Sequence, residues 1–122
     1  MKVVNSNLFV DNAGHKGRGV FTSKVLKKGE IIEICHVIEI SRKDHQMLVG
    51  NIIENYTFVW NTQKKTAAIV LGFGSLYNHT KKPNADYIKK IKQGVMVFKA
   101  IKDIKVGEEI TIDYGEMHAD LT

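Results

Sequence analysis

The sequence predicts a single domain over residues 1–122 that is mainly β, with a short helical insert at residues 41–60. Its 122 residues and 43% hydrophobic content suit one core and are too few for two ordinary domains. β-Branched residues dominate residues 31–40, and glycine-bearing turns separate short apolar runs, as is typical of strands. Residues 21–31 and 98–110 also share a pattern, from an aromatic residue through spaced apolar residues to a Gly-Glu turn and a new strand.

The first forty residues predict two strands and then one or two more. The segment VVNSNLFVDNAGHKGRGVF alternates short apolar runs with polar turns, which predicts two strands joined by a loop that contains several glycines. Lys28-Gly29-Glu30 indicates a turn, after which residues 31–40 predict one or two buried strands. Cys35 lies in this apolar run, so a buried structural thiol is favoured over a reactive one.

The insert at residues 41–60 carries the signals of a short helix. Ser41, with Asp44 three residues later, predicts a helix N-terminus. Gly50 disfavours a long helix, because glycine weakens helix interiors. The apolar residues that follow the N-terminus recur at spacings that suit an amphipathic helix: Met47, Leu48, Ile52 and Ile53.

The second half of the chain predicts strands around one irregular stretch. Residues 63–70 read as a polar turn leading into a strand, residues 88–98 as a hairpin turning at Gln93-Gly94, and residues 110–112 as a closing strand. Residues 71–84, LGFGSLYNHTKKPN, combine glycines, an Asn-His pair and the only proline, which suits neither a plain strand nor a plain helix. This stretch is predicted to be a ligand-binding loop.

Composition narrows the classes of partner. A formal charge of +5 favours polyanions such as nucleic acid, yet residues 106–122 hold five of the 13 acidic residues and no Lys or Arg. That acidic segment either docks a basic peptide or solvates the terminus. No window approaches the ~18 apolar residues of a membrane span and no secretory pattern opens the chain, so an intracellular protein without membrane contact is expected. One cysteine and scattered histidines predict no metal site.

Four short motifs occur in an informative order. They are Gly-Arg-Gly-Val-Phe at 17–21, Asn-His at 78–79 with Pro-Asn at 83–84, Gly-Glu-Glu-Ile at 107–110 and Asp-Tyr-Gly at 113–115. Together they resemble a SET domain, the fold of protein lysine methyltransferases that use S-adenosylmethionine, over nearly the whole chain. The compact length is most similar to the minimal viral SET proteins that methylate host histone. The resemblance implies a β-clip fold of several small sheets, whose central and C-terminal stretches thread past each other in a pseudoknot.

The same resemblance assigns roles to individual residues. It implies that the pseudoknot brings Asn78 and Tyr114 together, that Asn78 and His79 bind the amino-acid and adenine parts of the cofactor, and that Tyr114 is at the methyl-transfer centre. The cofactor-binding residues it implies are Lys16, Gly17, Arg18, Gly19, Asn78, His79 and Tyr114. The catalytic residues are Tyr114 and Tyr56, and the substrate channel is lined by Tyr56, Tyr87, Phe98 and Ile112. Methyl transfer to an amine is an in-line displacement, so alignment and a neutral lysine matter more than a strong base.

Ordinary structural roles stand beside these assignments. Tyr56 would equally suit the buried face of a helix, and Tyr87 could simply cover a strand. Asn78 could stabilise its own turn and His79 could be a hydrogen-bonded core imidazole. Tyr77 is expected in the core, and Glu108 and Glu109 are expected to shape a turn and pair locally.

The implied function is an S-adenosylmethionine-dependent lysine methyltransferase acting on a basic peptide, with histone tails first, in the nucleus. Many family members close the substrate channel with a cysteine-rich segment, which is missing after Cys35. Met117, His118 and Leu121, a second subunit in a homodimer, or the substrate would then close it. Alternatives are a methyltransferase of non-histone proteins, or a SET-fold module that binds nucleic acid or nucleosomal DNA through its basic body.

Overall fold

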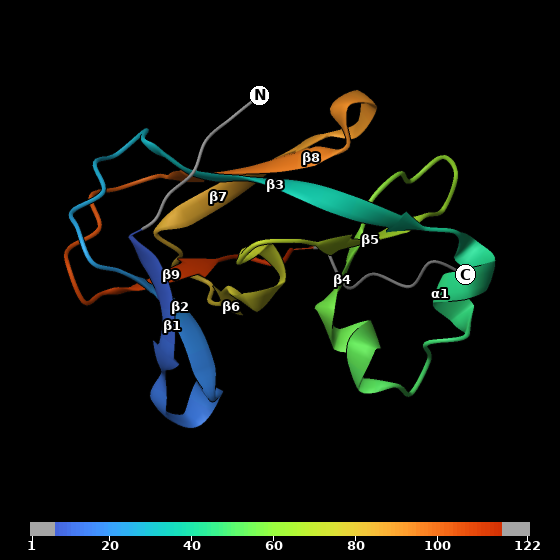
Figure 1. The fold of residues 1–122 in the computed structure, drawn as a ribbon, viewed down its shortest axis with the longest axis horizontal. Helices are drawn as coiled ribbons and strands as arrows, with labels where there is room; N and C mark the ends of the chain where they lie inside the picture. The colour runs from blue at the N-terminus through green and yellow to red at the C-terminus, as the bar shows by residue number, and fades with distance from the viewer. Residues whose placement is uncertain (1–6, 116–122) are drawn as a thin grey trace.

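The computed structural model describes residues 7–115, whose strands form two sheets that meet around one core (Figure 1). The strands are β1 (Leu8–Asn12), β2 (Arg18–Thr22), β3 (Ile31–Ile40), β4 (Thr57–Val59), β5 (Ala67–Val70), β6 (Asn78–His79), β7 (Ala85–Lys90), β8 (Val95–Ala100) and β9 (Glu109–Ile112). The helices are α1 (Arg42–Gln46) and the 3-10 helices η1 (Gly14–Lys16), η2 (Ile52–Tyr56), η3 (Gly74–Leu76) and η4 (Ile91–Gln93). One sheet has the order β1-β2-β9-β6 and the other β4-β5-β3-β8-β7. The prediction of a mainly β domain is confirmed.

The long strand β3 lies at the centre of the five-stranded sheet, between β5 and β8. Ile32 and Cys35 face the core and are 0% and 2% exposed, so the buried thiol was predicted correctly. Ile31 and Ile38 are 45% and 54% exposed, so the prediction of a buried run was wrong for them. A β-bulge between Ile31 and Glu33 shifts the alternation of side chains along β3, so Ile32 and Cys35 both face the core while Ile31 and Ile38 face solvent.

The two segments of similar sequence pair with each other. Leu26 and Ile104 exchange backbone hydrogen bonds of 2.9 and 2.8 Å, and both side chains are fully buried. The glycine of each turn donates to a strand belonging to the other segment, Gly29 to the carbonyl of Ala100 at 2.8 Å and Gly107 to that of Thr22 at 3.2 Å. The pair of turns, residues 22–30 and 100–108, is therefore a two-fold arrangement built on a repeated sequence pattern.

The insert is less helical than predicted. Ser41 caps α1 as expected, since its hydroxyl accepts a hydrogen bond from the Asp44 amide at 3.1 Å. The helix ends at Gln46, however, and Gly50 adopts a left-handed conformation with φ 83° that an α-helix cannot contain. Met47 and Ile52 are consequently 76% and 68% exposed rather than packed on one helix face. Within residues 7–115 no helix combines the length and apolar character of a membrane span.

The central stretch runs beside the C-terminal strand. β6 pairs with β9 in parallel, and the Thr80 amide extends the ladder to the Ile112 carbonyl at 2.9 Å. Two glycines shape the approach to β6. Gly72 has a φ of 67°, and a Cβ on Gly74 would lie 2.1 Å from Cγ1 of Val70, so no other residue fits there. As predicted, this stretch is neither a plain strand nor a plain helix.

Asn84 connects the central stretch to β9 through its side chain. Its Nδ2 donates to the Glu109 carbonyl at 2.8 Å, and its Oδ1 accepts from the Thr111 amide at 2.9 Å. The side chain thus substitutes for a strand on this part of β9, and the residue is only 8% exposed. A buried backbone group without a hydrogen-bond partner destabilises the fold. The side-chain amide of Asn84 therefore supplies hydrogen bonds that this part of β9 would otherwise lack.

We predict that Asn84→Asp lowers the free energy of unfolding by about 2 to 3 kcal/mol, because a carboxylate oxygen would then face the Glu109 carbonyl without a hydrogen to donate. The matched control is Asn12→Asp. Asn12 uses only its oxygen, which accepts from the Gly14 amide at 2.7 Å, so a carboxylate can replace it. Urea unfolding of both variants tests this, and equal stability of the two would contradict the role of Asn84.

Candidate functional site

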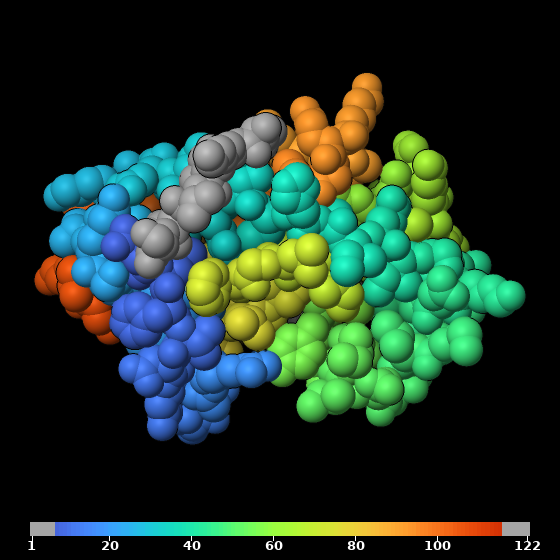
Figure 2. Space-filling view, viewed as in Figure 1, coloured from blue at the N-terminus to red at the C-terminus, as the bar shows by residue number. Residues whose placement is uncertain are grey.

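The predicted site residues gather where β2, β6 and β9 meet the insert. Figure 2 shows the central stretch (yellow) at the surface between the hairpin of β1 and β2 (blue) and the insert (green). The resemblance implied that Asn78 and Tyr114 come together, and the parallel pairing of β6 with β9 brings these two segments side by side.

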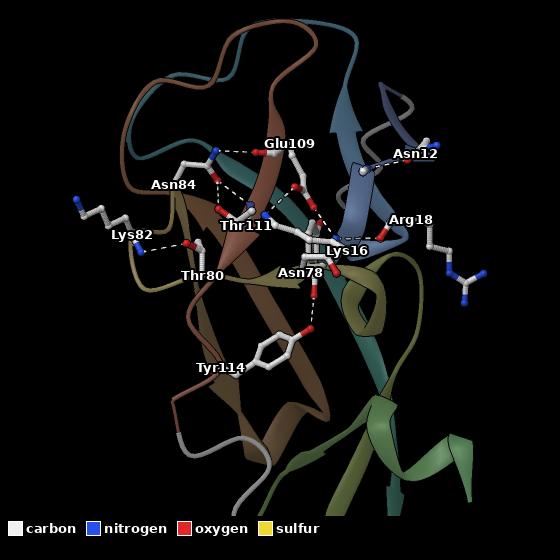
Figure 3. Close-up of polar contacts among 12 residues, drawn as sticks. Asn12, Lys16, Arg18, Asn78, Thr80, Lys82, Asn84, Glu109, Thr111 and Tyr114 are labelled. Atoms are coloured by element: carbon white, nitrogen blue, oxygen red, sulfur yellow. Dashed lines mark hydrogen bonds and ion pairs between the residues drawn. The ribbon is translucent and has the colours of Figure 1, made fainter.

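The amide of Asn78 is held by two acceptors (Figure 3). Nδ2 donates to the Arg18 carbonyl at 2.9 Å and to Oε2 of Glu109 at 2.6 Å. The other carboxylate oxygen, Oε1, pairs with Nζ of Lys16 at 3.2 Å. Glu109 therefore connects Lys16, at the end of η1, with Asn78 on β6.

The glycines of the β2 loop allow this close packing. Gly17 has a φ of 82°, a conformation that favours glycine, and its carbonyl accepts from the Ala13 amide at 2.7 Å. A Cβ on Gly19 would lie 2.4 Å from Oε2 of Glu109 and 3.0 Å from Nδ2 of Asn78. Gly19 is thus required for the carboxylate and the amide to lie against the backbone of β2.

Tyr114 is fixed at both ends. Its hydroxyl donates to the Tyr77 carbonyl at 2.6 Å, and its amide donates to Nδ1 of His79 at 2.9 Å. Burial raises the pKa of the Tyr114 phenol, and the negative charges of Tyr56 and Glu109 raise that pKa further. The phenol therefore stays neutral and keeps its hydrogen over the physiological pH range.

The hydrogen bond from Tyr114 also determines the tautomer of His79. A ring nitrogen that accepts a hydrogen bond carries no hydrogen, so the hydrogen of neutral His79 is on Nε2. Nδ1 also lies 3.7 Å from Oδ1 of Asp113, but it cannot donate there while it accepts from Tyr114. The imidazole and phenol rings pack with their centroids 5.0 Å apart.

Tyr56 faces the same region from the end of η2. Its side chain is half-buried, and its hydroxyl accepts a long contact of 3.5 Å from Nη2 of Arg18. Because an ionised Tyr56 would raise the pKa of Tyr114, the two phenols are electrostatically coupled. The structure thus brings the two predicted catalytic tyrosines to one region.

The remaining predicted channel residues lie deeper. The Tyr87 hydroxyl donates to the Tyr114 carbonyl at 3.3 Å, and its ring packs against Phe58 and Phe98. Phe98 and Ile112 are 0% exposed. Without accessible surface, these two can affect a substrate only through the side chains packed on them.

Tyr77 joins the site to the core. It is 1% exposed, which confirms its predicted core position, and its hydroxyl donates to Oε1 of Glu33 at 2.6 Å. Burial is the main cause that raises the pKa of Glu33, against the hydrogen bond from Tyr77 that lowers it. One residue thus contacts a buried carboxyl with its side chain and Tyr114 with its backbone.

Glu109 contacts two of the predicted site residues, although its sequence pattern did not indicate a place in the site. Glu108 and Glu109 were both expected to pair locally. This is correct for Glu108, which accepts from the Lys105 amide at 2.7 Å, and wrong for Glu109, whose partners are Lys16 and Asn78. The alternation of side chains along a strand could have indicated this. A strand that buries Ile110 on one face places Glu109 on the other face.

Comparison with known proteins identifies the fold. A model of the SET domain matches residues 17–115. The Schizosaccharomyces pombe "Histone-lysine N-methyltransferase, H3 lysine-37 specific" is 30% identical over 115 residues, or 93% of this chain and 77% of that protein. This chain matches only 15% of the length of a longer relative, histone-lysine N-methyltransferase set9 of Aspergillus terreus.

Solved structures agree. A candidate histone methyltransferase of Plasmodium falciparum has a TM-score of 0.73 and 32% identity, over 92% of this chain and 96% of that chain. A Chaetomium thermophilum Polycomb Repressive Complex 2 bound to S-adenosylmethionine has a TM-score of 0.75 and 23% identity, over 93% of this chain and 16% of that chain. The predicted SET fold is confirmed.

Burial of the site predicts how its tyrosines titrate. Tyr77 and Tyr114 have raised pKa values, so both should ionise later than free tyrosine, and Tyr114→Phe should remove one late ionisation. Both pKa values are higher in the folded state than in the unfolded state. The contribution of these two tyrosines to the free energy of unfolding is therefore fully present below the pKa of unfolded tyrosine, and it is lost as pH rises through the folded-state pKa values. Ultraviolet difference spectra over the pH range in which the protein stays folded measure this. A variant that keeps every late ionisation of the wild-type protein would contradict the burial of Tyr114.

Proposed function

Because the chain belongs to the SET-domain family, we propose that it is an S-adenosylmethionine-dependent protein lysine N-methyltransferase acting on a basic peptide. The observation that carries the proposal is the fixed, neutral phenol of Tyr114, whose hydroxyl donates to the Tyr77 carbonyl at 2.6 Å beside Asn78 and His79. Histone tails are the first candidate substrate, because the Schizosaccharomyces pombe relative is named for a histone lysine.

The donor set fits the cofactor. Gly17 exposes backbone that a ligand can approach closely, and the buried Gly19 leaves room for the Glu109 carboxylate, with which a Cβ there would collide. Asn78 offers an amide oxygen and His79 an Nε2 hydrogen for polar groups. When bound, the cofactor supplies the methyl group on its sulfonium. The residues proposed to hold it are Lys16, Gly17, Arg18, Gly19, Asn78, His79 and Tyr114.

Tyr114 is proposed to align the substrate amine. Methyl transfer to lysine mainly requires a neutral amine in the correct orientation. A phenol oxygen that donates its hydrogen to the Tyr77 carbonyl keeps lone pairs with which it can accept a hydrogen bond from an amine. The Phe58 ring, whose centroid is 6.4 Å from that of Tyr114, helps to exclude water, and a desolvated lysine has a lowered pKa. Tyr56 and Tyr87 are proposed to form the walls of the channel, with Phe98 and Ile112 packed behind them.

Several finer assignments stay predictions. A histone substrate would imply action in the nucleus. The likeness to minimal viral SET proteins, a homodimer and a contact with nucleosomal DNA are among these predictions, and Met117, His118 and Leu121, predicted to close the channel, lie outside the described residues. A non-histone substrate is an alternative that the same site chemistry would serve.

The decisive experiment is mass spectrometry of core histones incubated with the protein and S-adenosylmethionine. We expect methylation that falls about 100-fold or more in Tyr114→Phe, because that variant loses the hydroxyl that aligns the amine. Cofactor binding by the variant, followed by thermal unfolding, serves as the control and should fall far less than turnover, because the other proposed cofactor-binding residues are unchanged. Normal turnover by Tyr114→Phe would contradict the role proposed for this residue.

Cofactor binding separates the proposal from a binding module that lacks turnover. A ligand that binds only the native state must raise its stability. If S-adenosylmethionine raises the melting temperature but no histone is methylated, the substrate is another protein. If the cofactor has no effect on unfolding even in large excess, the methyltransferase proposal fails and a nucleic-acid-binding module is favoured.

A further inference from the structure

The amide of Asn78 can adopt only one orientation. Its two nearest polar partners are the Arg18 carbonyl, 2.9 Å away, and Oε2 of Glu109, 2.6 Å away. Both are acceptors, because a carbonyl and an ionised carboxylate have no hydrogen to donate. Turning the amide over would place its oxygen against the carboxylate, so Nδ2 must face Glu109 and Oδ1 must point away from it.

Oδ1 of Asn78 remains available to a ligand. Among residues 7–115 it makes no hydrogen bond, although the side chain is half-buried. An amide oxygen of fixed direction is a suitable acceptor for an ammonium group, and hydrogen bonds to charged groups are the stronger kind. The amino-acid part of S-adenosylmethionine carries such an ammonium.

We propose that Glu109 is a positioning residue for the cofactor: it holds the Asn78 amide so that Oδ1 accepts the cofactor's ammonium. The inference rests on the proposed function and adds to it a residue that the motif assignments left out. Glu109 acts through Asn78, and its carboxylate also balances the charge of Lys16, whose Nζ lies 3.2 Å from Oε1.

The surroundings hold the carboxylate in place. The Glu109 side chain is 16% exposed, and Gly19 leaves just enough room for it, since a Cβ there would lie 2.4 Å from Oε2. The backbone of Glu109 is bound by Nδ2 of Asn84 at 2.8 Å. Both ends of the residue are thus fixed before any ligand binds, which reduces the ordering that binding requires.

Glu109→Gln is the informative substitution because it preserves shape and removes one acceptor. Glutamine has a single oxygen for two donors, Lys16 and Asn78. The charged Lys16 forms the stronger hydrogen bond and takes that oxygen. The amide nitrogen of the new residue then faces Nδ2 of Asn78, which keeps only the Arg18 carbonyl as an acceptor. The Asn78 amide is no longer held in one orientation, so the cofactor's ammonium loses an acceptor of fixed direction.

Isothermal titration calorimetry of the full chain tests the inference with two ligands. S-adenosylmethionine should bind Glu109→Gln roughly 10- to 100-fold more weakly, the effect of one hydrogen bond to a charged group. Methylthioadenosine, which lacks the amino-acid part, should bind equally well to the wild-type protein and the variant. Glu108→Gln is the matched control, since Glu108 only closes its own turn, and it should bind both ligands like the wild type.

A double-mutant cycle distinguishes positioning from general damage. If Glu109 acts through Asn78, Glu109→Gln should cause no further loss of affinity in an Asn78→Ala background. Three results would overturn this inference without affecting the proposed function. They are equally weakened binding of both ligands to Glu109→Gln, additive losses of affinity in the cycle, and an unchanged affinity of Glu109→Gln for S-adenosylmethionine. Failure of the wild-type protein to bind S-adenosylmethionine would overturn the proposed function and this inference together.

Discussion

The parallel pairing of β6 with β9 is the constraint on which the rest of the site depends. It aligns Asn78 with Thr111 and His79 with Ile112, so side chains from two distant segments of the chain share one surface. Closing so long a loop costs entropy, which the ladder alone offsets poorly because β6 has only two residues. The side chain of Asn84 adds the missing bonds to β9, and the carboxylate of Glu109 connects β9 with Asn78 on β6 and with Lys16 of η1. The site is therefore held by side chains as much as by backbone.

Local signals explain what could be predicted of the fold. The Ser41 cap, the turn at Gly94 and the alternation of apolar runs depend on neighbours within a few residues, and the structure contains them as expected. The exposure of Ile38 could not be predicted in the same way. Whether one face of a strand is buried depends on elements that are far away in the sequence, and here the side chain of Ile38 is exposed to solvent.

The same difference between short-range and long-range signals decides which residues of the candidate site could be predicted. Asn78, His79 and Tyr114 were identified because their motifs occur in a specific order, whereas Glu109 was taken for a turn residue. Its partners are 93 and 31 residues away, and no short-range rule connects them. Glu108, one position earlier, follows the short-range rule. Two adjacent residues of the same type thus have different roles, because Glu108 lies in the turn before β9, whereas Glu109 is the first residue of β9 and lies on the face opposite Ile110.

Tyr77 links the packing of the core to the alignment of Tyr114, which affects how the domain can evolve. Its ring packs against Phe98 with centroids 4.7 Å apart and its hydroxyl contacts a buried carboxyl, while its carbonyl holds the hydroxyl of Tyr114. A substitution that repacks this part of the interior therefore moves the group on which Tyr114 is aligned. Selection for thermal stability and selection for turnover act here on the same atoms, so this region should accept fewer neutral substitutions than its distance from any substrate suggests.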